Sequence, residues 1–214
     1  SSFISLEIVL GVMRDPEANA VLLRKVGNTL RDSVYEQVVW AVENGVTAGT
    51  GPDTFGPHNT CTTAQIITFL WRAYGSPTPA GGSSFSDVPV GAWYADAAAW
   101  AEEEGLVAGA LFHGNAPATR AATMTYLWKL ADRPEVGSTL FSDVPAGSYY
   151  AKAAQWALEN GITTGVGGSS FGSNSTVTRA QVVTFLWRAA GSPKVSGGSF
   201  ADVDSNAYYA DAVA

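Results

Sequence analysis

Few side chains in this sequence of 214 residues are of the types that usually carry catalysis or bind metal ions. There is one cysteine, Cys61, and there are two histidines, His58 and His113. One cysteine cannot form an intrachain disulfide or a cysteine metal cluster, and two histidines cannot make a three-histidine zinc site. Carboxylates could supplement the histidines, but we expect no metal site and no cofactor. Cys61 is predicted to be a small core residue, and both histidines are predicted to be solvated.

Two arginines are in positions where a positive charge has a cost. Arg120 and Arg179 each follow a threonine that begins a predicted helix, so both lie in a first helical turn. A cation there opposes the helix dipole, which favours a binding or salt-bridging role over simple solvation. The planar fork of donors on an arginine matches a carboxylate group. From the residues alone, a functional contact and a salt bridge within the protein both stay open for the two arginines.

The arginines belong to a repeated pattern that dominates the sequence. The phrase Trp-Ala-x-Glu-x-Gly occurs three times, beginning at Trp40, Trp100 and Trp156. A glycine, a phenylalanine, a threonine, a second tryptophan and a proline follow each phrase in the same order. A motif of the form Phe-x-Asp-Val, which we name the opening motif, precedes the second and third phrases. Opening motifs begin at Phe85, Phe141 and Phe200, and the last of them starts a fourth copy that ends at Ala214.

Each copy is predicted to form two helices. The first runs from about Trp93 or Tyr149 to the residue before Gly105 or Gly161, where glycine fits a left-handed C-terminal cap. The second begins at the threonine, and Thr-x-x-Gln at residues 62–65 and 178–181 predicts a capping box. Gly-Ser-Pro at 75–77 and 191–193 ends it. We expect the tryptophans of both helices to be core residues, and the second helices to bury three equivalent side chains, Phe69, Tyr126 and Phe185.

These phrases resemble the S-layer homology domain, a cell-wall-anchoring module of bacterial surface proteins. The resemblance rests on the opening motifs, the tryptophan phrase and the Thr-Arg-Ala triplets at 119–121 and 178–180. It implies a mainly α fold, with tandem two-helix repeats in a pseudo-threefold helical bundle. It also implies a non-catalytic module at the bacterial cell surface, which binds secondary cell-wall polysaccharide, often pyruvylated, in grooves between adjacent repeats.

The same resemblance implies which residues bind the polysaccharide. The candidates are the arginines of the triplets, the aspartates of the opening motifs, an aromatic early in each first helix and a loop glycine: Arg120, Arg179, Asp87, Asp143, Trp93, Tyr149, Gly109 and Gly165. The aspartates could accept sugar hydroxyls or could instead cap the helix that follows, and both interpretations stay open. Repeat 1 has Thr63 at the arginine position and lacks an opening motif, so its groove is expected to be weak or absent.

The first 36 residues do not fit the repeat. They predict a helix (3–13), a turn, a strand (20–26) and a helix from about Asn28, which is an α/β pattern. Residues 1–41 resemble a stretch of the large terminase subunit of tailed phages, one that follows the phosphate-binding Walker A loop in that family. The glycines and lysine of that loop are absent. We interpret the chain as a fragment at both ends, and as a possible chimera.

The predicted organisation is a terminase-like segment (1–36), repeat 1 without its opening motif (37–78), repeat 2 (85–134), repeat 3 (141–193) and the start of a further repeat (200–214). The net charge of −7 argues against a nucleic-acid partner, and no apolar run reaches the ~20 residues that span a membrane. We expect a secretion signal, if there is one, to lie upstream. Alternatives to wall binding are a surface-lattice repeat without sugar binding and an inactive fragment of a DNA-packaging ATPase.

Overall fold

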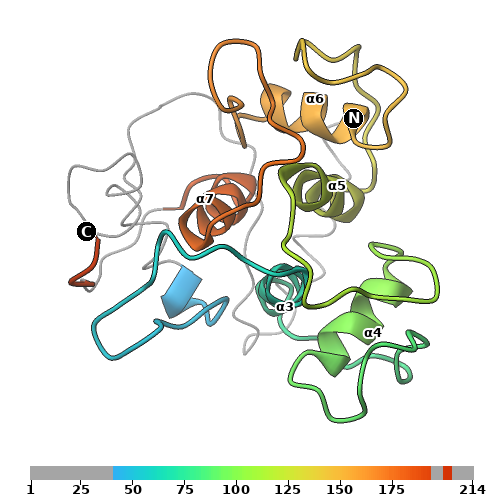
Figure 1. Ribbon diagram of the computed structural model, residues 1–214, viewed down its shortest axis with the longest axis vertical. Helices are drawn as coiled ribbons and strands as arrows, with labels where there is room; N and C mark the ends of the chain where they lie inside the picture. The colour runs from blue at the N-terminus through green and yellow to red at the C-terminus, as the bar shows by residue number, and fades with distance from the viewer. Residues whose placement is uncertain (1–40, 194–199, 204–214) are drawn as a thin grey trace. The chain divides into compact units, whose positions relative to one another are not determined.

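The computed structural model describes residues 41–193 and 200–203, and this part of the chain is mainly helical (Figure 1). Residues 41–43 are helical. The helices that follow are α3 (Thr63–Ala73), α4 (Ala95–Glu103), α5 (Arg120–Leu130), α6 (Ala151–Glu159) and α7 (Arg179–Ala189). The prediction of a mainly α chain of two-helix repeats is confirmed. The helices and the strand predicted within the first 36 residues lie outside the described residues.

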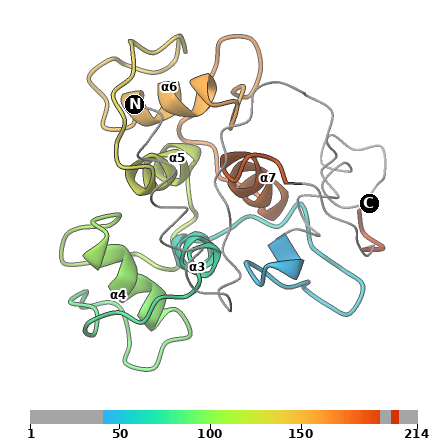
Figure 2. The same ribbon diagram turned by 180° about the vertical axis from the view of Figure 1, so that it is seen from behind.

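The chain divides into two compact units. The first comprises Ser1–Asn59, Phe69–Ser76 and Thr178–Ala214. Its described part holds the loop of repeat 1, the end of α3, all of α7 and the third opening motif. The second comprises Thr60–Thr68 and Pro77–Val177, and so contains the start of α3 together with α4, α5 and α6. In the second unit α5 packs against α6, and in both views α5 lies between α4 and α6 (Figures 1 and 2).

The second helix of each repeat begins where its threonine predicts. Thr178 forms a full capping box with Gln181 at the start of α7. Before α3 the Thr62 amide donates to the Gln65 side chain, and the Thr62 hydroxyl accepts from the Gln65 amide. The Thr119 side chain accepts only from the Ala122 amide, because an alanine cannot return the bond. Each helix begins one residue after its threonine, which is the N-cap.

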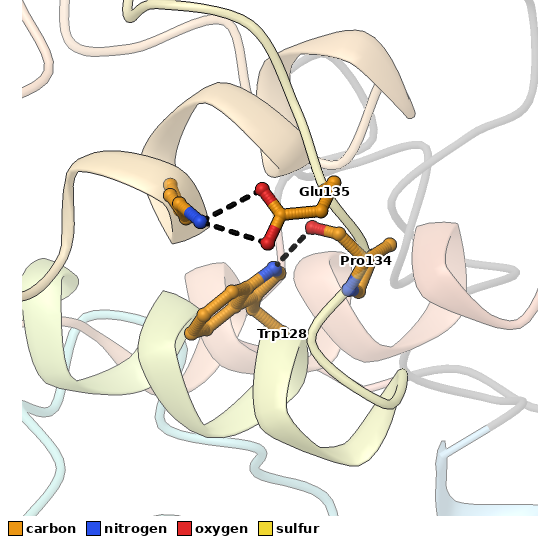
Figure 3. Close-up of polar contacts among 4 residues, drawn as sticks. Trp128, Pro134 and Glu135 are labelled. Atoms are coloured by element: carbon orange, nitrogen blue, oxygen red, sulfur yellow. Dashed lines mark hydrogen bonds and ion pairs between the residues drawn. The ribbon is translucent and has the colours of Figure 1, made fainter.

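The first helices end at glycines with left-handed backbone, as predicted. Gly105 has φ 64° and Gly161 has φ 67°, a conformation that glycine adopts without steric cost. The second helices end in two left-handed residues followed by the repeat's proline. Figure 3 shows this ending in repeat 2, where the Trp128 indole donates to the Pro134 carbonyl over 3.0 Å and Glu135 pairs with Lys152 at 2.7 Å.

The core residues agree in part with the predicted set. Phe69 and Phe185 are each 4% exposed, and the tryptophans at 100, 156 and 187 are buried as well. Tyr126 is only half-buried, and desolvation raises its pKa to about 12. Trp71 and Trp128 are also half-buried. The Trp128 indole lies at the helix end, where it holds the closing proline segment rather than filling the core.

Three equivalent residues of the second compact unit hydrogen-bond in a closed cycle just before the N-caps. The Ala118 amide donates to the Cys61 carbonyl, the Val177 amide donates to the Ala118 carbonyl, and the Cys61 amide donates to the Val177 carbonyl, all over 2.9–3.0 Å. All three side chains are buried. The prediction that Cys61 is a small core residue is confirmed, and the cycle satisfies backbone groups that burial would otherwise leave unpaired.

Candidate functional site

Each repeat has a loop between its two helices, and each loop holds a fully buried phenylalanine. We name them loop 1 (46–59, with Phe55), loop 2 (106–116, with Phe112) and loop 3 (162–175, with Phe171). No more than 2% of any of these three side chains is exposed. The site residues predicted from the sequence gather around these phenylalanines, so the site is built outward from them.

The opening-motif aspartates of repeats 2 and 3 hold the backbone of their own loops. Asp87 accepts from the amides of Phe112 (2.6 Å) and His113 (2.7 Å). Asp143 accepts from the amides of Phe171 (2.7 Å) and Gly172 (2.9 Å), and also from the Ser170 hydroxyl. These bonds to the ionised form lower the pKa of Asp87, with the Phe112 amide the largest cause, and lower the pKa of Asp143 to about 2. Neither carboxylate caps the helix that follows.

Loop 1 has the same partner, but it comes from the other end of the chain. Asp202, in the third opening motif, accepts from the amides of Phe55 and Gly56, each over 2.8 Å. Phe200 packs on Phe55 with ring centroids 5.7 Å apart, as Phe141 packs on Phe171 at 5.2 Å. The opening motif that the repeat pattern assigns to a fourth copy therefore completes repeat 1. The expectation that repeat 1 lacks such an aspartate is corrected by this contact.

The two arginines are buried beneath loop phenylalanines of other repeats. Arg120 is 3% exposed and Arg179 is 7% exposed. The Nε of Arg120 donates to the Phe171 carbonyl over 2.9 Å, and its guanidinium lies 5.3 Å from the Phe171 ring centroid. The Nε of Arg179 donates to the Phe55 carbonyl over 2.9 Å, with the guanidinium 4.6 Å from that ring. The arginine of one repeat therefore hydrogen-bonds to the loop of another repeat.

Both guanidinium groups also reach a buried threonine at the same place in the loop. The Nη2 of Arg120 donates to Thr163 Oγ1 over 2.7 Å. The Nη2 of Arg179 donates to Thr47 Oγ1 over 3.2 Å and to the Ala48 carbonyl over 2.6 Å. These charge-assisted bonds in a buried setting are strong. They hold the first residues of each loop, whereas the aspartate holds residues nearer the loop's end.

Loop 2 lacks this arrangement. Thr63 stands at the arginine position, and its amide and hydroxyl both reach only the Ala116 carbonyl, over 2.9 and 3.3 Å. The loop threonine is replaced by Val107, which is half-buried. We name the three assemblies by opening-motif aspartate, loop phenylalanine and residue at the arginine position: clamp 1 (Asp202, Phe55, Arg179), clamp 2 (Asp87, Phe112, Thr63) and clamp 3 (Asp143, Phe171, Arg120).

Exposed aromatic side chains stand beside clamps 2 and 3. Trp93 is 64% exposed and Tyr149 is 67% exposed. Each packs edge-on, at 5.1 Å, against the next residue, Tyr94 or Tyr150. Tyr94 stacks on Phe112 and Tyr150 stacks on Phe171. Each of these two clamps thus carries a large apolar surface in water at a defined place, which is the arrangement an aromatic needs to meet the face of a sugar ring.

The loop glycines differ between the clamps. A Cβ on Gly165 would lie 2.9 Å from the Phe141 ring, and one on Gly49 would lie 3.2 Å from the Phe200 ring. Both glycines therefore allow the opening-motif phenylalanine to approach the loop closely. Gly109 has φ 118° but open space around it. In loop 2, which is three residues shorter, glycine is required by backbone conformation alone.

The structure places the predicted site residues in two groups, at clamps 3 and 2, and leaves Arg179 outside both. Asp143, Arg120 and Gly165 surround Phe171, with Tyr149 beside them, while Asp87, Trp93 and Gly109 belong to clamp 2. Arg179 lies at loop 1 with Asp202, which the predicted site did not include. The sequence contained a signal for this pairing of Asp202 with loop 1. Repeat 1 has no opening motif of its own, and the opening motif at Phe200 is not followed by a full repeat. Within residues 41–193 and 200–203 there is no group of three potential metal ligands, and no helix there could cross a membrane.

Comparisons with known proteins agree with both sequence resemblances. The family model described as S-layer homology domain matches residues 32–67, 84–123 and 140–183. The family model described as phage terminase large subunit matches residues 1–48. No curated protein matches the chain. The first family model covers more than half of the chain, and each of its three matches includes one whole loop.

Proposed function

This chain belongs to the S-layer homology domain family, and from that premise we propose that it binds secondary cell-wall polysaccharide at its clamps. The repeats of this family are non-catalytic cell-wall anchoring modules, which associates the chain with the bacterial cell surface. We propose that the ligand is an anionic glycan, for which a pyruvylated polymer is one example. The proposed partner is thus a polymer of the wall, with no nucleic acid involved.

The observation that carries the proposal is an exposed aromatic beside a rigidly held loop, found in the same form twice. Trp93 and Tyr149 each expose about two thirds of their surface, although burial of such side chains is favourable. Both are oriented by the tyrosine that follows them and thereby by the loop phenylalanine. A polymer lying across a clamp would stack on this aromatic and meet the loop backbone next to it.

We assign different roles to the other site residues. Asp87, Asp143, Gly109 and Gly165 shape the loop that the glycan meets. Arg120 and Arg179 hold the loop from its buried side and add positive charge beneath it, which favours an anionic ligand over a neutral one. Direct contact between either guanidinium and a ligand carboxylate stays a prediction, since both side chains are 7% exposed or less.

Sedimentation with purified bacterial sacculi tests the proposal. The parent chain should bind sacculi that retain their secondary polymer and should not bind sacculi from which acid has removed it. Tyr149→Ala should weaken binding several-fold. Leu140→Ala is a matched control, because Leu140 is a large exposed side chain directly before the same repeat, 71% exposed, but belongs to no clamp. Equal binding to stripped sacculi would contradict the proposal and favour a lattice protein without sugar binding.

The arginines provide a second test. Arg120→Ala and Arg179→Ala should each weaken binding, and the double variant should nearly abolish it. Since both residues support buried structure, each variant must first be shown to fold by circular dichroism and urea denaturation. A folded double variant that binds sacculi as well as the parent would refute a role for the arginines.

A further inference from the structure

We infer that loop 1 is a docking site for an opening motif supplied by a second copy of this chain. In this exchange the motif at residues 200–203 of one copy fills loop 1 of the other, and it makes there the contacts that it makes in its own chain. The site binds protein, so it goes beyond the proposed function, and no glycan takes part in it. Loop 1, Arg179 and the motif all belong to one compact unit.

Three contacts join the motif to loop 1. Asp202 accepts from the amides of Phe55 and Gly56, and the Phe200 ring packs on the Phe55 ring. Between them, the Ala201 amide donates over 2.7 Å to the carbonyl two residues before Phe55. Apart from the Phe55 ring, loop 1 contributes only backbone groups to these contacts. The loop therefore recognises a phenylalanine followed two residues later by an aspartate, whichever chain carries them.

The opening motifs of repeats 2 and 3 make the same three contacts, but with loops that are near them in the sequence. Asp87 and Asp143 accept from amides 25 and 28 residues away, whereas Asp202 accepts from an amide 147 residues away. Repeats 2 and 3 also place a first helix, α4 or α6, between motif and loop. The motif at 200–203 lies after α7 in the sequence instead. Its exchange between chains therefore breaks only the motif's own contacts and leaves every described helix intact.

Loop 1 is also held in shape from the side opposite to the motif. Arg179 donates from Nε to the Phe55 carbonyl and from Nη2 to Thr47 Oγ1. These bonds remain when the motif leaves, but the amides of Phe55 and Gly56 then lose the carboxylate to which they donate, and the Phe55 ring loses its cover. Leaving such groups unpaired is costly. An empty loop 1 is thus a preformed site that favours the binding of another motif.

The connection between α7 and the motif sets the concentration at which chains exchange. Six residues, 194–199, separate Pro193 from Phe200, and four of the six are glycine or serine. Linkers of this length and composition give a tethered segment an effective concentration of roughly 1 mM. The motif therefore stays in its own chain in dilute solution, and exchange becomes populated as the protein concentration approaches that value. Reciprocal exchange leaves no loop 1 unfilled, so its product is a closed dimer.

Two complementary variants of the full chain test the inference. The acceptor variant, Phe200→Ala with Asp202→Ala, lacks the motif, so its loop 1 is open to a motif from another chain. The donor variant, Gly49→Val, keeps the motif but blocks its own loop 1. A Cβ on Gly49 would lie 2.6 Å from the Thr54 carbonyl oxygen and 3.2 Å from the Phe200 ring. We expect the mixture to form a heterodimer in analytical ultracentrifugation, with a Kd below roughly 1 mM, because the same contact forms within one chain at that effective concentration.

Amide resonances measured by NMR locate the contact. As the donor variant is added, the Phe55 and Gly56 amides of the acceptor variant should shift, while the Phe171 and Gly172 amides should not. A donor that also carries Asp202→Ala is the matched control and should bind at least tenfold more weakly, because it offers neither amide an acceptor. The parent chain should bind the donor variant at least about twofold more weakly than the acceptor variant does, since its own motif competes for loop 1.

Circular dichroism must first show that each variant is folded, and Asp202→Ala alone replaces the acceptor variant if the double exchange does not fold. No association between folded variants at about 1 mM would overturn the inference. So would a heterodimer that forms equally well with the donor carrying Asp202→Ala. Sacculi are absent from these measurements, so their outcome is independent of whether the chain binds wall polysaccharide.

Discussion

Clamps 3 and 2 lie in the same compact unit and are built from repeats with the same elements. They differ at the two positions that contact the buried side of the loop, the arginine position and the loop threonine position. Arg120 joins loop 3 through the Phe171 carbonyl and Thr163, whereas Thr63 reaches loop 2 only through Ala116. Loop 3 has Gly172 where loop 2 has His113, and both residues are left-handed. One pattern of apolar residues and caps thus supports two loops that are held by different hydrogen bonds. The fold of a repeat does not require the cation, so the arginine can serve the site.

The largest effect should come from removing the arginine of clamp 3. Arg120→Ala deletes two charge-assisted hydrogen bonds in a buried place, each contributing about 1.5–3 kcal/mol, so the free energy of unfolding should fall by about 3 kcal/mol. Thr63→Ala, its counterpart in clamp 2, should cost less than about 1 kcal/mol. Urea denaturation measures both. Equal losses would contradict the difference between the clamps.

Building the missing half into clamp 2 should make it resemble clamp 3. Thr63→Arg with Val107→Thr supplies the cation beneath Phe112 and the hydroxyl that accepts from it. We expect the double variant to bind sacculi more tightly than the parent, by about a factor of ten. Val107→Thr alone is the control and should not increase binding, since it adds an acceptor without a donor. An affinity that does not rise in a folded double variant would show that the arginine–threonine pair is not what clamp 2 lacks.

Acid should loosen loop 3 through its aspartate. The pKa of Asp143 is lowered from 3.8 to about 2 because the Phe171 and Gly172 amides donate to the ionised form. A lowered pKa means that the contribution is fully present above about pH 4 and is lost as the pH falls through about 2. Exchange protection of the Phe171 amide, measured relative to an exposed reference amide, should decline over this interval. In Asp143→Asn the decline should be absent, and a persisting one would point to another group.

The smallest effect concerns backbone strain in loop 2. His113 has φ 55°, where the equivalent residues of loops 1 and 3 are glycines. A left-handed conformation costs a residue with a Cβ up to about 1–2 kcal/mol, part of which the flexibility of glycine in the unfolded chain offsets. His113→Gly should therefore stabilise the chain by up to about 1 kcal/mol, detectable as a higher urea midpoint. His58→Gly, at an exposed position of loop 1, is the control and should not stabilise.

The sequence predicts the site residues that recur at regular spacings, but it does not predict which distant residues they contact. The opening-motif aspartates, the loop glycines and the aromatics are identifiable because they recur at fixed spacings. Their partners cannot be identified in this way. The aspartates accept hydrogen bonds from backbone amides, and almost any residue type can supply a backbone amide. The two roles predicted for Asp87 and Asp143, sugar contact and helix capping, did not include the bond to the loop that the structure shows.

The local architecture of this protein is specified along the sequence. N-caps at threonine, left-handed glycines after the first helices and prolines after the second are interactions within a few residues, so composition and spacing are enough to predict them. Which repeat each long-range group serves depends instead on tertiary packing. Asp202 meets Phe55 across 147 residues and Arg179 meets it across 124. Such pairings arise when packing brings a side chain next to a loop that is far away in the sequence. A buried charge such as Arg179 must find hydrogen-bond partners there, and periodicity along the chain does not say which loop supplies them.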